Sequence, residues 1–557
     1  MREWLMGVET EYAVSAITDG FYERCRYADR LVERAYEQLV TLHDLGGGGL
    51  FLENGSRLYV DSGNHPELCT PECMNPTEVV RYLLAGEQIM LQLAKGSGQP
   101  AYQVFKHNQD YLSHQGWGCH ESYLHRANPN IISSDILAHL VTRIIFTGAG
   151  GFDVFRRGPE FLISPRTSFL KRLMTENSTG TRGILHIKDE PHAQYGYHRF
   201  HLLCGESLSS ELATWLKMAT TMLVVAMSDV GLHPGSDLRL SEPLLAVGLI
   251  AEDPTLEARL QLVNGKLLTA LEIQRCYLAK ARDHQRDDFM PPWAEVACDR
   301  WEETLNLIED GPEAVATKLD WAIKQKVFKQ HARRRGFTAD RLDHWKVCLR
   351  EVQAALTIGG EPPLPSATTM LDPFSPVGRI VERTLRKLCG RGFDRDELED
   401  VFSLVDELRE IDVRFGELGA DGLFCQLDRA GVLTHRMDGV SDIETAMTEP
   451  PSAGRARVRG LAIRECFEQR GRYRCDWQGI VDHDKQRILD LSDPFVTNAN
   501  WRDAPVKGED YATTFADLIY FRNGPRMFNS AAATINAASI SEAPSFFPQA
   551  EVRERHD

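Results

Sequence analysis

Alternating apolar and polar residues near the start of the chain predict a β-strand. In the stretch EWLMGVETEYAVSA, Trp4, Met6 and Val8 fall on one face of an extended chain. Glu9 and Glu11 fall on the other face. We therefore expect a strand that buries its apolar residues and carries two carboxylates on the opposite side.

The same period of two recurs in FLENGSRLYVD, which predicts a hairpin. Asn54 and Gly55 separate two apolar runs, and this pair is a strong signal for a tight turn between antiparallel strands. Beyond the turn, Arg57, Tyr59 and Asp61 occupy every second position. An arginine, a phenol and a carboxylate would thus line one face of the second strand.

Helices are predicted on either side of this hairpin. Residues 22–45 carry apolar residues at helical intervals, and four glycines at 46–49 end the pattern. After the hairpin, Asn75 offers an N-cap, Pro76 a first helical position and Glu78 a capping-box partner. A long helix should begin there.

Strands and helices continue to alternate over the middle of the chain. Further strands are predicted at 101–107, 182–190 and 198–207. The apolar stretch 213–231 is interrupted by Lys217 and Asp229, which predicts a buried core helix and not a membrane span. An antiparallel-rich sheet combined with long helices predicts an α+β fold.

Beyond about residue 285 the pattern becomes largely helical. One helical block is predicted from about residue 285, a second at 377–417 and a third in RVRGLAIRECFEQRG. A loop or linker is predicted at 359–376. RYRCDWQGIVD alternates, and this predicts a strand. The tail after about residue 505 is weakly patterned, and we expect it to be partly disordered.

Composition and charge limit the classes of protein to which this chain can belong. Its 557 residues carry a net charge of −17, whereas a nucleic-acid or anionic-membrane surface needs clustered positive charge. We expect neither partner. The N-terminal stretch lacks the pattern of a secretory signal and the twelve cysteines are scattered like reduced thiols, so we expect a cytoplasmic protein. Cys69 and Cys73 lack a second Cys or His pair at metal-binding spacing, and we expect two packing residues.

Four carboxylates near the predicted strands raise the question of a cation site. Glu9 and Glu11, together with Asp61 and Glu67, cannot all ionise cheaply side by side, and a divalent cation would resolve the conflict. Magnesium prefers oxygen ligands and usually arrives with phosphate, which Arg57 would suit. Charged residues on an exposed strand face are also common, so a solvated face remains an alternative.

Other candidate residues carry weaker signals. The chain has neither GxxxxGK[ST] nor GxSxG, so a P-loop and a nucleophile elbow are absent from its sequence. Isolated histidines are more often core or surface residues than ligands; those singled out are His120, His186, His192 and His201. Arg455, Arg457 and Arg459 alternate in PPSAGRARVRG, where they either clamp phosphate or form an exposed basic segment.

Several sequence blocks together resemble one family. The blocks are GVETEYAV, NGSRLYVDSGNHPELCTPEC, FKHNQD with GCHESYL, IKDEPHA, RFHLLCGES, ALEIQRCYL, LDWAIKQK, and PPSAGRARVRG followed by DWQGIVDHD and DPF. In this order they resemble the Pup ligase and Pup deamidase/depupylase family, relatives of glutamine synthetase and glutamate-cysteine ligase.

The resemblance implies a domain plan. A glutamine-synthetase-like ATP and magnesium domain, with a curved antiparallel sheet and flanking helices, would include residues 1–285 and continue to about 410, with an insertion at 350–410. A smaller, mainly helical C-terminal domain would occupy 411–500, and 501–557 would be an extension.

The resemblance also implies roles for individual residues. Asp61 matches the catalytic aspartate. Positions at the magnesium ion are matched by Glu9, Tyr59 and Glu67, with Glu11 and His201 in matching blocks. Nucleotide contacts are matched by Arg57, Thr70 and Trp477, with Arg455 in a matching block.

The reaction implied is ATP-dependent isopeptide ligation. The C-terminal glutamate of a small ubiquitin-like modifier, Pup or an analogue, would become a γ-glutamyl phosphate and then be joined to a target lysine, which would tag the target for the proteasome. VETEY and the short connection to the next block resemble the ligase branch. Deamidation or depupylation, small-molecule carboxylate-amine ligation and a catalytically silent binding protein are the alternatives.

The sequence departs from the family pattern in four places. Lys188 stands where arginine is usual and Ala13 where glycine is usual, and the two others are the 350–410 insertion and the extension after DPF. These departures bear more on the identity of the modifier than on the reaction.

Overall fold

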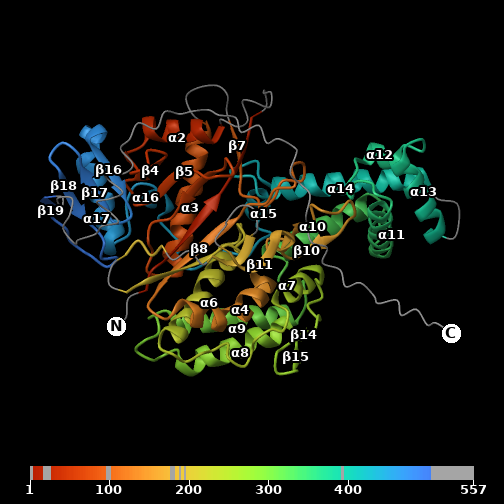
Figure 1. Ribbon diagram of the computed structural model, residues 1–557, viewed down its shortest axis with the longest axis horizontal. Coiled ribbons are helices and arrows are strands. Elements are labelled where there is room, and N and C mark those ends of the chain that lie inside the picture. Colours follow the sequence, from red (N-terminus) through yellow and green to blue (C-terminus); the bar gives the residue numbers. More distant parts are fainter. Residues whose placement is uncertain are drawn as a thin grey trace, which may run out of the picture. The chain divides into compact units, whose positions relative to one another are not determined.

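A large mixed β-sheet dominates the computed structural model, which describes residues 4–16, 27–95, 102–175, 182–186, 190–193, 196–389 and 394–503 (Figure 1). Within these residues, nine strands pair in the order β11-β12-β13-β8-β1-β6-β5-β4-β3. The strands are β1 (Met6–Glu11), β3 (Thr41–His43), β4 (Gly49–Leu52), β5 (Arg57–Val60), β6 (Pro66–Cys69), β8 (Cys119–His125), β11 (Leu170–Thr175), β12 (Arg182–His186) and β13 (His198–Leu202). Neighbouring strands are antiparallel except β11 and β12, which are parallel.

The predicted hairpin is confirmed as β4 and β5. The backbone N–H of Leu52 donates to the carbonyl of Ser56 at 2.9 Å, and Gly55 lies between them with φ +87°. That left-handed conformation favours glycine. The turn therefore aligns β5 so that Arg57 and Tyr59 share one face, as predicted.

Helices cover the opposite, apolar face of the sheet. Leu58 and Leu68 are buried there, beneath α2 (Tyr27–Gln38) and α3 (Pro76–Lys95). The predicted N-cap of α3 is confirmed, because Asn75 accepts from the N–H of Glu78 at 2.9 Å. The Glu78 carboxylate reaches back as a capping-box partner would, but it accepts from the N–H of Met74 at 2.8 Å and not from that of Asn75.

The predicted core helix at 213–231 is α6 (Glu211–Asp229). It is buried along almost its whole length and packs on α3 and β8. Lys217 is buried with it, and its ammonium donates to the carbonyl of Glu206 at 3.0 Å. None of the described helices combines the length and the apolar character that crossing a bilayer requires.

Two N-terminal elements differ from the sequence prediction. The helix expected at 22–45 ends at Gln38, and Thr41–His43 form β3 because they pair with β4 as the edge of the sheet. The strand expected at 3–16 divides at Tyr12, after which β2 (Ala13–Ser15) pairs with β7 (Gln103–Phe105). Ala13 is extended there, a conformation open to any residue.

Two hydrophobic clusters organise the helices that follow. The larger cluster contains α4 (Pro129–Thr142), α5 (Ile144–Thr147), α6, α7 (Pro243–Glu252), α8 (Ala270–His284) and α9 (Ala294–Glu309). The second contains α10 (Asp320–Arg334), α11 (Ala339–Ile358), α12 (Ala367–Leu371), α13 (Pro376–Cys389) and α14 (Arg395–Phe415). The loop expected at 359–376 thus includes a short helix, whose Met370 is buried in the second cluster.

The C-terminal part adds helices and a small sheet beside β3 and β4 (Figure 1). Its helices are α15 (Leu423–Arg429), α16 (Ile443–Ala446) and α17 (Gly454–Cys466), with the 3-10 helix η2 (Phe467–Arg472). An antiparallel sheet of the described chain contains β16 (Tyr473–Asp476), β17 (Gly479–Asp482), β18 (Arg487–Asp490) and β19 (Trp501–Asp503). The strand expected in RYRCDWQGIVD is therefore a hairpin, with Trp477 in its turn.

The remaining described strands are short pairs, β9 (Gly151–Phe152) with β10 (Phe161–Leu162) and β14 (Leu260–Gln261) with β15 (Leu267–Leu268); a 3-10 helix, η1 (Pro165–Phe169), precedes β11. The described residues up to Asp503 form one compact unit. The domain limits near 285 and 410 stay predictions. Lys188 and the extension from residue 504 onward lie outside the described residues.

Candidate functional site

Four adjacent strands bring a row of polar side chains across one face of the large sheet. Glu9 on β1 lies opposite Cys69 on β6 and opposite His120 on β8. Arg57 on β5 lies opposite Cys69 from the other side. Because directly paired residues share a face of the sheet, these side chains lie on the side opposite to α2 and α3.

A second row runs parallel to the first. Tyr59 on β5 lies opposite Glu67 on β6, which in turn lies opposite Glu11 on β1. The sequence predicted that Glu9 and Glu11 share a face and that Arg57 and Tyr59 share a face. The strand register confirms both predictions and shows that the four side chains lie on the same face of the sheet.

The carboxylates on this face experience very different electrostatic environments. Burial, and then the charges of Glu9 and Glu11, raise the pKa of Glu67 well above its usual range. Burial opposes ionisation of Glu9 as well, but the neighbouring Arg199 holds the pKa of Glu9 well below its usual range. The pKa values of these two neighbouring acids are therefore shifted in opposite directions, downward for Glu9 and upward for Glu67.

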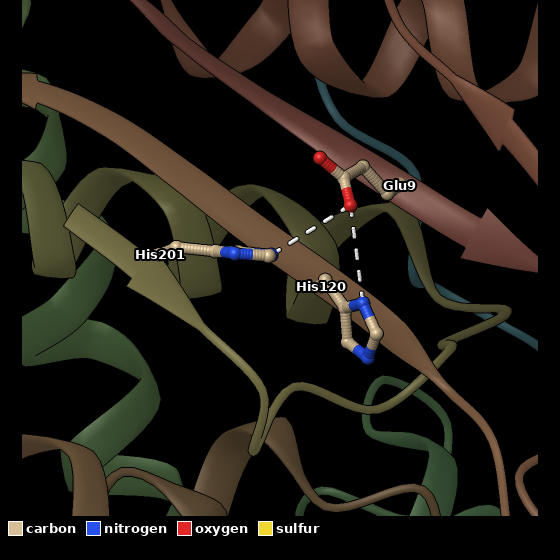
Figure 2. A group of neighbouring side chains, drawn as sticks. All are labelled: Glu9, His120 and His201. Carbon is tan, nitrogen blue, oxygen red and sulfur yellow. Dashed lines mark ion pairs between the residues drawn. The ribbon is translucent and has the colours of Figure 1, made fainter. Parts of the chain in front are cut away.

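Two imidazoles approach the Glu9 carboxylate from the strands on its other side (Figure 2). The Nδ1 atom of His120 on β8 is 3.9 Å from Glu9 Oε2, and Nε2 of His201 on β13 is 3.6 Å from the same oxygen. Burial and the charge of Arg199 lower the pKa of His201 to about 3. His201 is therefore neutral at neutral pH and keeps a lone pair for a ligand.

Three groups of side chains on this face have the spacing needed to hold a cation. Within each group, the potential ligand atoms lie within 4.8 Å of one another. The groups are Glu9 with His120 and His201, Glu9 with Glu67 and Cys69, and Glu11 with Asp61 and His65. Glu67 Oε1 is buried and has no hydrogen-bond partner in the described part of the chain, so it could accept a metal ion without losing another contact.

Asp61 lies just beyond β5, beside Glu11 and His65. Its carboxylate accepts from the backbone N–H of His65 at 2.6 Å, and its side chain is 13% exposed. Burial tends to raise the pKa of Asp61, but the hydrogen bonds from His65 outweigh it and the pKa lies below its usual value. An ionised, partly accessible carboxylate at this position can accept a proton.

An open pocket adjoins this face. Glu9 and Arg199 belong both to the polar face and to the pocket wall. Three residues predicted to contact a nucleotide also line the pocket, namely Thr70, Arg455 and Trp477. Thr70 is held at the end of β6, where its hydroxyl accepts from the N–H of Val8 at 3.1 Å. Residues distant in sequence thus meet around one cavity.

Arg57, the fourth residue predicted to contact a nucleotide, is engaged elsewhere. Its guanidinium pairs with Asp44 at 2.6 Å and lies over the ring of Tyr59 at 4.2 Å from the centroid. Arg57 remains on the polar face, but it is not among the residues of the described chain that line the pocket.

Glu72 connects the sheet to α17 at the wall of the pocket. Its carboxylate accepts from Arg455 Nε at 2.6 Å and also pairs with Arg459. Burial opposes ionisation, but the two guanidinium groups lower the pKa of Glu72 to about 2. Arg455 and Arg459 are buried, whereas Arg457 is exposed, so the exposed interpretation of this basic segment holds for one of its three arginines, at the start of α17.

Sequence analysis missed several residues of the site. Arg199 stands two positions before His201 on one strand, and this period of two could have placed it on the same face. Glu72 and His65 gave no such signal, because their partners are either remote in sequence or formed by the backbone.

Comparison with known families gives a match to most of the chain. The model of a family described as Pup-ligase protein matches residues 4–349 and 394–481. The match omits 350–393, a segment that includes the end of α11 together with α12 and α13.

Two relatives show similarity of different extent. A Pup–protein ligase of Nocardioides sp. is 29% identical over 510 residues, which cover 89% of this chain and 97% of the relative. A depupylase of Acidothermus cellulolyticus is 37% identical over 317 residues, which cover 54% of this chain and 62% of the relative.

Two solved structures share the fold. The complex between the prokaryotic ubiquitin-like protein Pup and its ligase PafA has a TM-score of 0.66 at 24% identity and covers 89% of this chain and 90% of that chain. The Pup ligase PafA in complex with ADP has a TM-score of 0.61 at 24% identity and covers 87% of this chain and 93% of that chain.

Proposed function

The chain belongs to the Pup-ligase protein family, and from this premise we propose that it is an ATP-dependent, isopeptide-forming ligase. It joins the side-chain carboxylate of the C-terminal glutamate of a small ubiquitin-like modifier, Pup or an analogue, to lysines of target proteins. The joined modifier marks the target for proteasomal degradation. We place this reaction in the cytoplasm, where ATP is available.

The observation that carries the proposal is the shared position of Glu9. Glu9 lines the pocket and also stands among the carboxylates and imidazoles of the polar face. A nucleotide in the pocket would therefore present its phosphates to oxygen and nitrogen donors that suit a cation, which is the arrangement phosphoryl transfer needs.

Magnesium fits the residues present. We assign Glu9, Tyr59 and Glu67 to the ion, with Glu11 and His201 as further donors. The unpartnered Glu67 Oε1 supports the assignment, and so does the raised pKa of Glu67, because a cation would offset both the burial and the repulsion from Glu9 and Glu11 that raise it. When bound, Mg²⁺ would neutralise charge that develops on the transferring phosphate.

Protein side chains then control two steps. In the first, the modifier's glutamate carboxylate attacks the γ-phosphorus of ATP, the bond to ADP breaks, and a γ-glutamyl phosphate forms. Thr70, Arg455 and Trp477 hold the nucleotide from the pocket wall, and Arg57 contacts its phosphates from the polar face. In the second, the lysine amine attacks the acyl carbon and phosphate leaves. Asp61 takes the proton that the lysine must lose, because an ammonium has no lone pair.

A second candidate function is deamidation or depupylation of the same modifier. The depupylase relative favours it, because its identity to this chain is 37%, against 29% for the ligase relative, although it covers only 54% of the chain. The short connection between β1 and β4 favours ligation, since the hydrolytic branch usually carries a long extra loop there.

An incubation of the purified protein with modifier, Mg-ATP and a lysine-bearing protein tests the proposal. We expect an adduct whose intact mass equals modifier plus target less one water, formed only with ATP. Release of modifier from a preformed conjugate without net ATP consumption would favour the hydrolase. ATP turnover with a free amino acid, but not with the modifier, would favour a small-molecule ligase.

A further inference from the structure

Glu72 lines the pocket beside two side chains that we assign to the nucleotide, and nothing in the family resemblance gives it a role. We propose that Glu72 is a positioning residue for the nucleotide, whose carboxylate fixes Arg455 and, through Arg459, Trp477 in the pocket wall. The inference rests on the proposed function, since it takes the ligand of the pocket to be ATP.

The first argument is the geometry of the carboxylate. Glu72 Oε1 accepts from Arg455 Nε at 2.6 Å and from Arg459 NH1 at 3.1 Å, while Oε2 pairs with Arg459 NH2. Arg455 and Arg459 lie four residues apart on α17, so both project from one face of the helix. One carboxylate therefore sets the orientation of two guanidinium groups.

The second argument is what this arrangement leaves available on Arg455. Its NH1 donates to the backbone carbonyl of His192, and its Nε is taken by Glu72. Its NH2 has no hydrogen-bond partner within the described residues, although Arg455 is only 5% exposed and lines the pocket. A guanidinium that is held at two of its nitrogens and open at the third is suited to donate to a phosphate oxygen.

The third argument concerns Trp477. The Arg459 guanidinium lies 4.8 Å from the centroid of the Trp477 ring, and Arg459 NH2 also donates to the carbonyl of Gly55 at 3.0 Å. Glu72 holds Arg459, and Arg459 supports an aromatic ring in the pocket wall against the turn of the β4–β5 hairpin. The same carboxylate thus acts on two pocket residues by different routes.

A neighbouring ion pair provides a matched control. Glu53, just before the same turn, pairs with Arg464 of the same helix α17 at 2.7 Å. It therefore also attaches α17 to the large sheet, through the β4–β5 turn instead of the segment after β6, and neither residue of this pair lines the pocket. Any effect that comes only from weaker attachment of α17 should appear in Glu53→Gln as well.

Calorimetric titration with ADP of the full chain in the presence of Mg²⁺ tests the proposal without requiring a modifier. We expect Glu72→Gln to weaken ADP binding by about 10- to 100-fold, the loss typical of a hydrogen bond to a charged group, and Glu53→Gln to bind like the wild type. If wild type itself binds no ADP, the proposed function fails; if wild type and folded Glu72→Gln bind ADP equally, only this inference fails.

A double-mutant cycle separates positioning from general loss of structure. In the Arg455→Ala background, removal of the Glu72 charge should weaken ADP binding much less than it does in wild type, because part of its effect passes through Arg455. Full additivity, or equal losses in Glu72→Gln and Glu53→Gln, would overturn the proposal. Should Glu72→Gln fail to fold, Glu72→Asp decides: it shortens the reach but keeps the charge, and folded protein with unchanged ADP affinity contradicts the inference.

Discussion

Glu67 lies directly opposite Tyr59 on neighbouring strands, and its carboxyl is buried with a pKa held well above the usual range by burial and by Glu9 and Glu11. In the folded protein without a cation, ionisation of Glu67 is therefore disfavoured, at a cost to stability. A site built at such a cost to stability is typical of a binding centre, where the ligand later supplies the missing charge.

This relationship predicts opposite effects of one substitution on stability and on binding. Glu67→Gln keeps the shape and removes the repulsion, so we expect the melting temperature of the metal-free protein to stay level or rise by about 1–2 °C. The same change should weaken Mg²⁺-dependent ADP binding at least about tenfold, because the amide is a poorer ligand. Thermal melts with chelator, and titrations with Mg²⁺, measure the two effects; a clearly lower melting temperature without metal would contradict the prediction.

Asp61→Asn should block the second chemical step and spare the first. We expect ligation to a lysine to fall at least about 100-fold, within the range that general-base catalysis contributes, while ADP affinity changes little. Hydroxylamine is neutral at pH 7 and needs no base, so the variant should still form the modifier hydroxamate from the γ-glutamyl phosphate. Mass spectrometry detects this product. Loss of hydroxamate together with ligation would place Asp61 in the phosphoryl-transfer step instead.

The sequence predicted the local parts of this site well. Period-two alternation placed Glu9 and Glu11 on one face of β1, and Arg57 and Tyr59 on one face of β5, because side-chain direction on a strand depends only on the local backbone. The Asn54–Gly55 turn and the cap of α3 were confirmed for the same reason. Such features require no knowledge of distant partners.

Features that depend on tertiary pairing were missed or misplaced. The apolar pattern of the preceding helix continues through residues 41–43, but the backbone of these residues pairs with β4. RYRCDWQGIVD alternates throughout, and only its pairing with itself shows that Trp477 lies in a turn. Glu72 pairs with arginines that are remote in sequence, since 383 positions separate it from Arg455.

The helices outside the family match should be separable from the chemistry. Leu385 on α13 is fully buried in the cluster formed with α11 and α14. Leu385→Ala should cost about 2–5 kcal/mol of stability within that cluster. No described residue of 339–415 lines the pocket, so ADP affinity should remain at the wild-type value.

Hydrogen exchange and ADP titration of Leu385→Ala test this separation. We expect faster exchange confined to α11–α14, with protection of β1 and β6 unchanged. Exchange that rises equally in the central sheet, or a weaker ADP complex, would show that these helices support the pocket.

His201 should make the metal-free protein sensitive to acid. Burial and Arg199 lower its pKa to about 3 from the usual 6.5. The unfolded chain therefore takes up a proton near pH 6.5, whereas the folded chain does not. The contribution of His201 to stability is therefore fully retained above pH 6.5 and is lost as the pH falls below it. This residue alone lowers the free energy of unfolding by about 1.4 kcal/mol per pH unit until the pH approaches the pKa of the folded state. His201→Gln removes that titration. Urea unfolding in the presence of chelator, at several pH values between about 5 and 7, measures the free energy of unfolding of both proteins. We expect this free energy to fall less steeply with decreasing pH in the variant than in the wild type. Parallel curves for the two proteins would mean that His201 is protonated as readily in the folded chain as in the unfolded one.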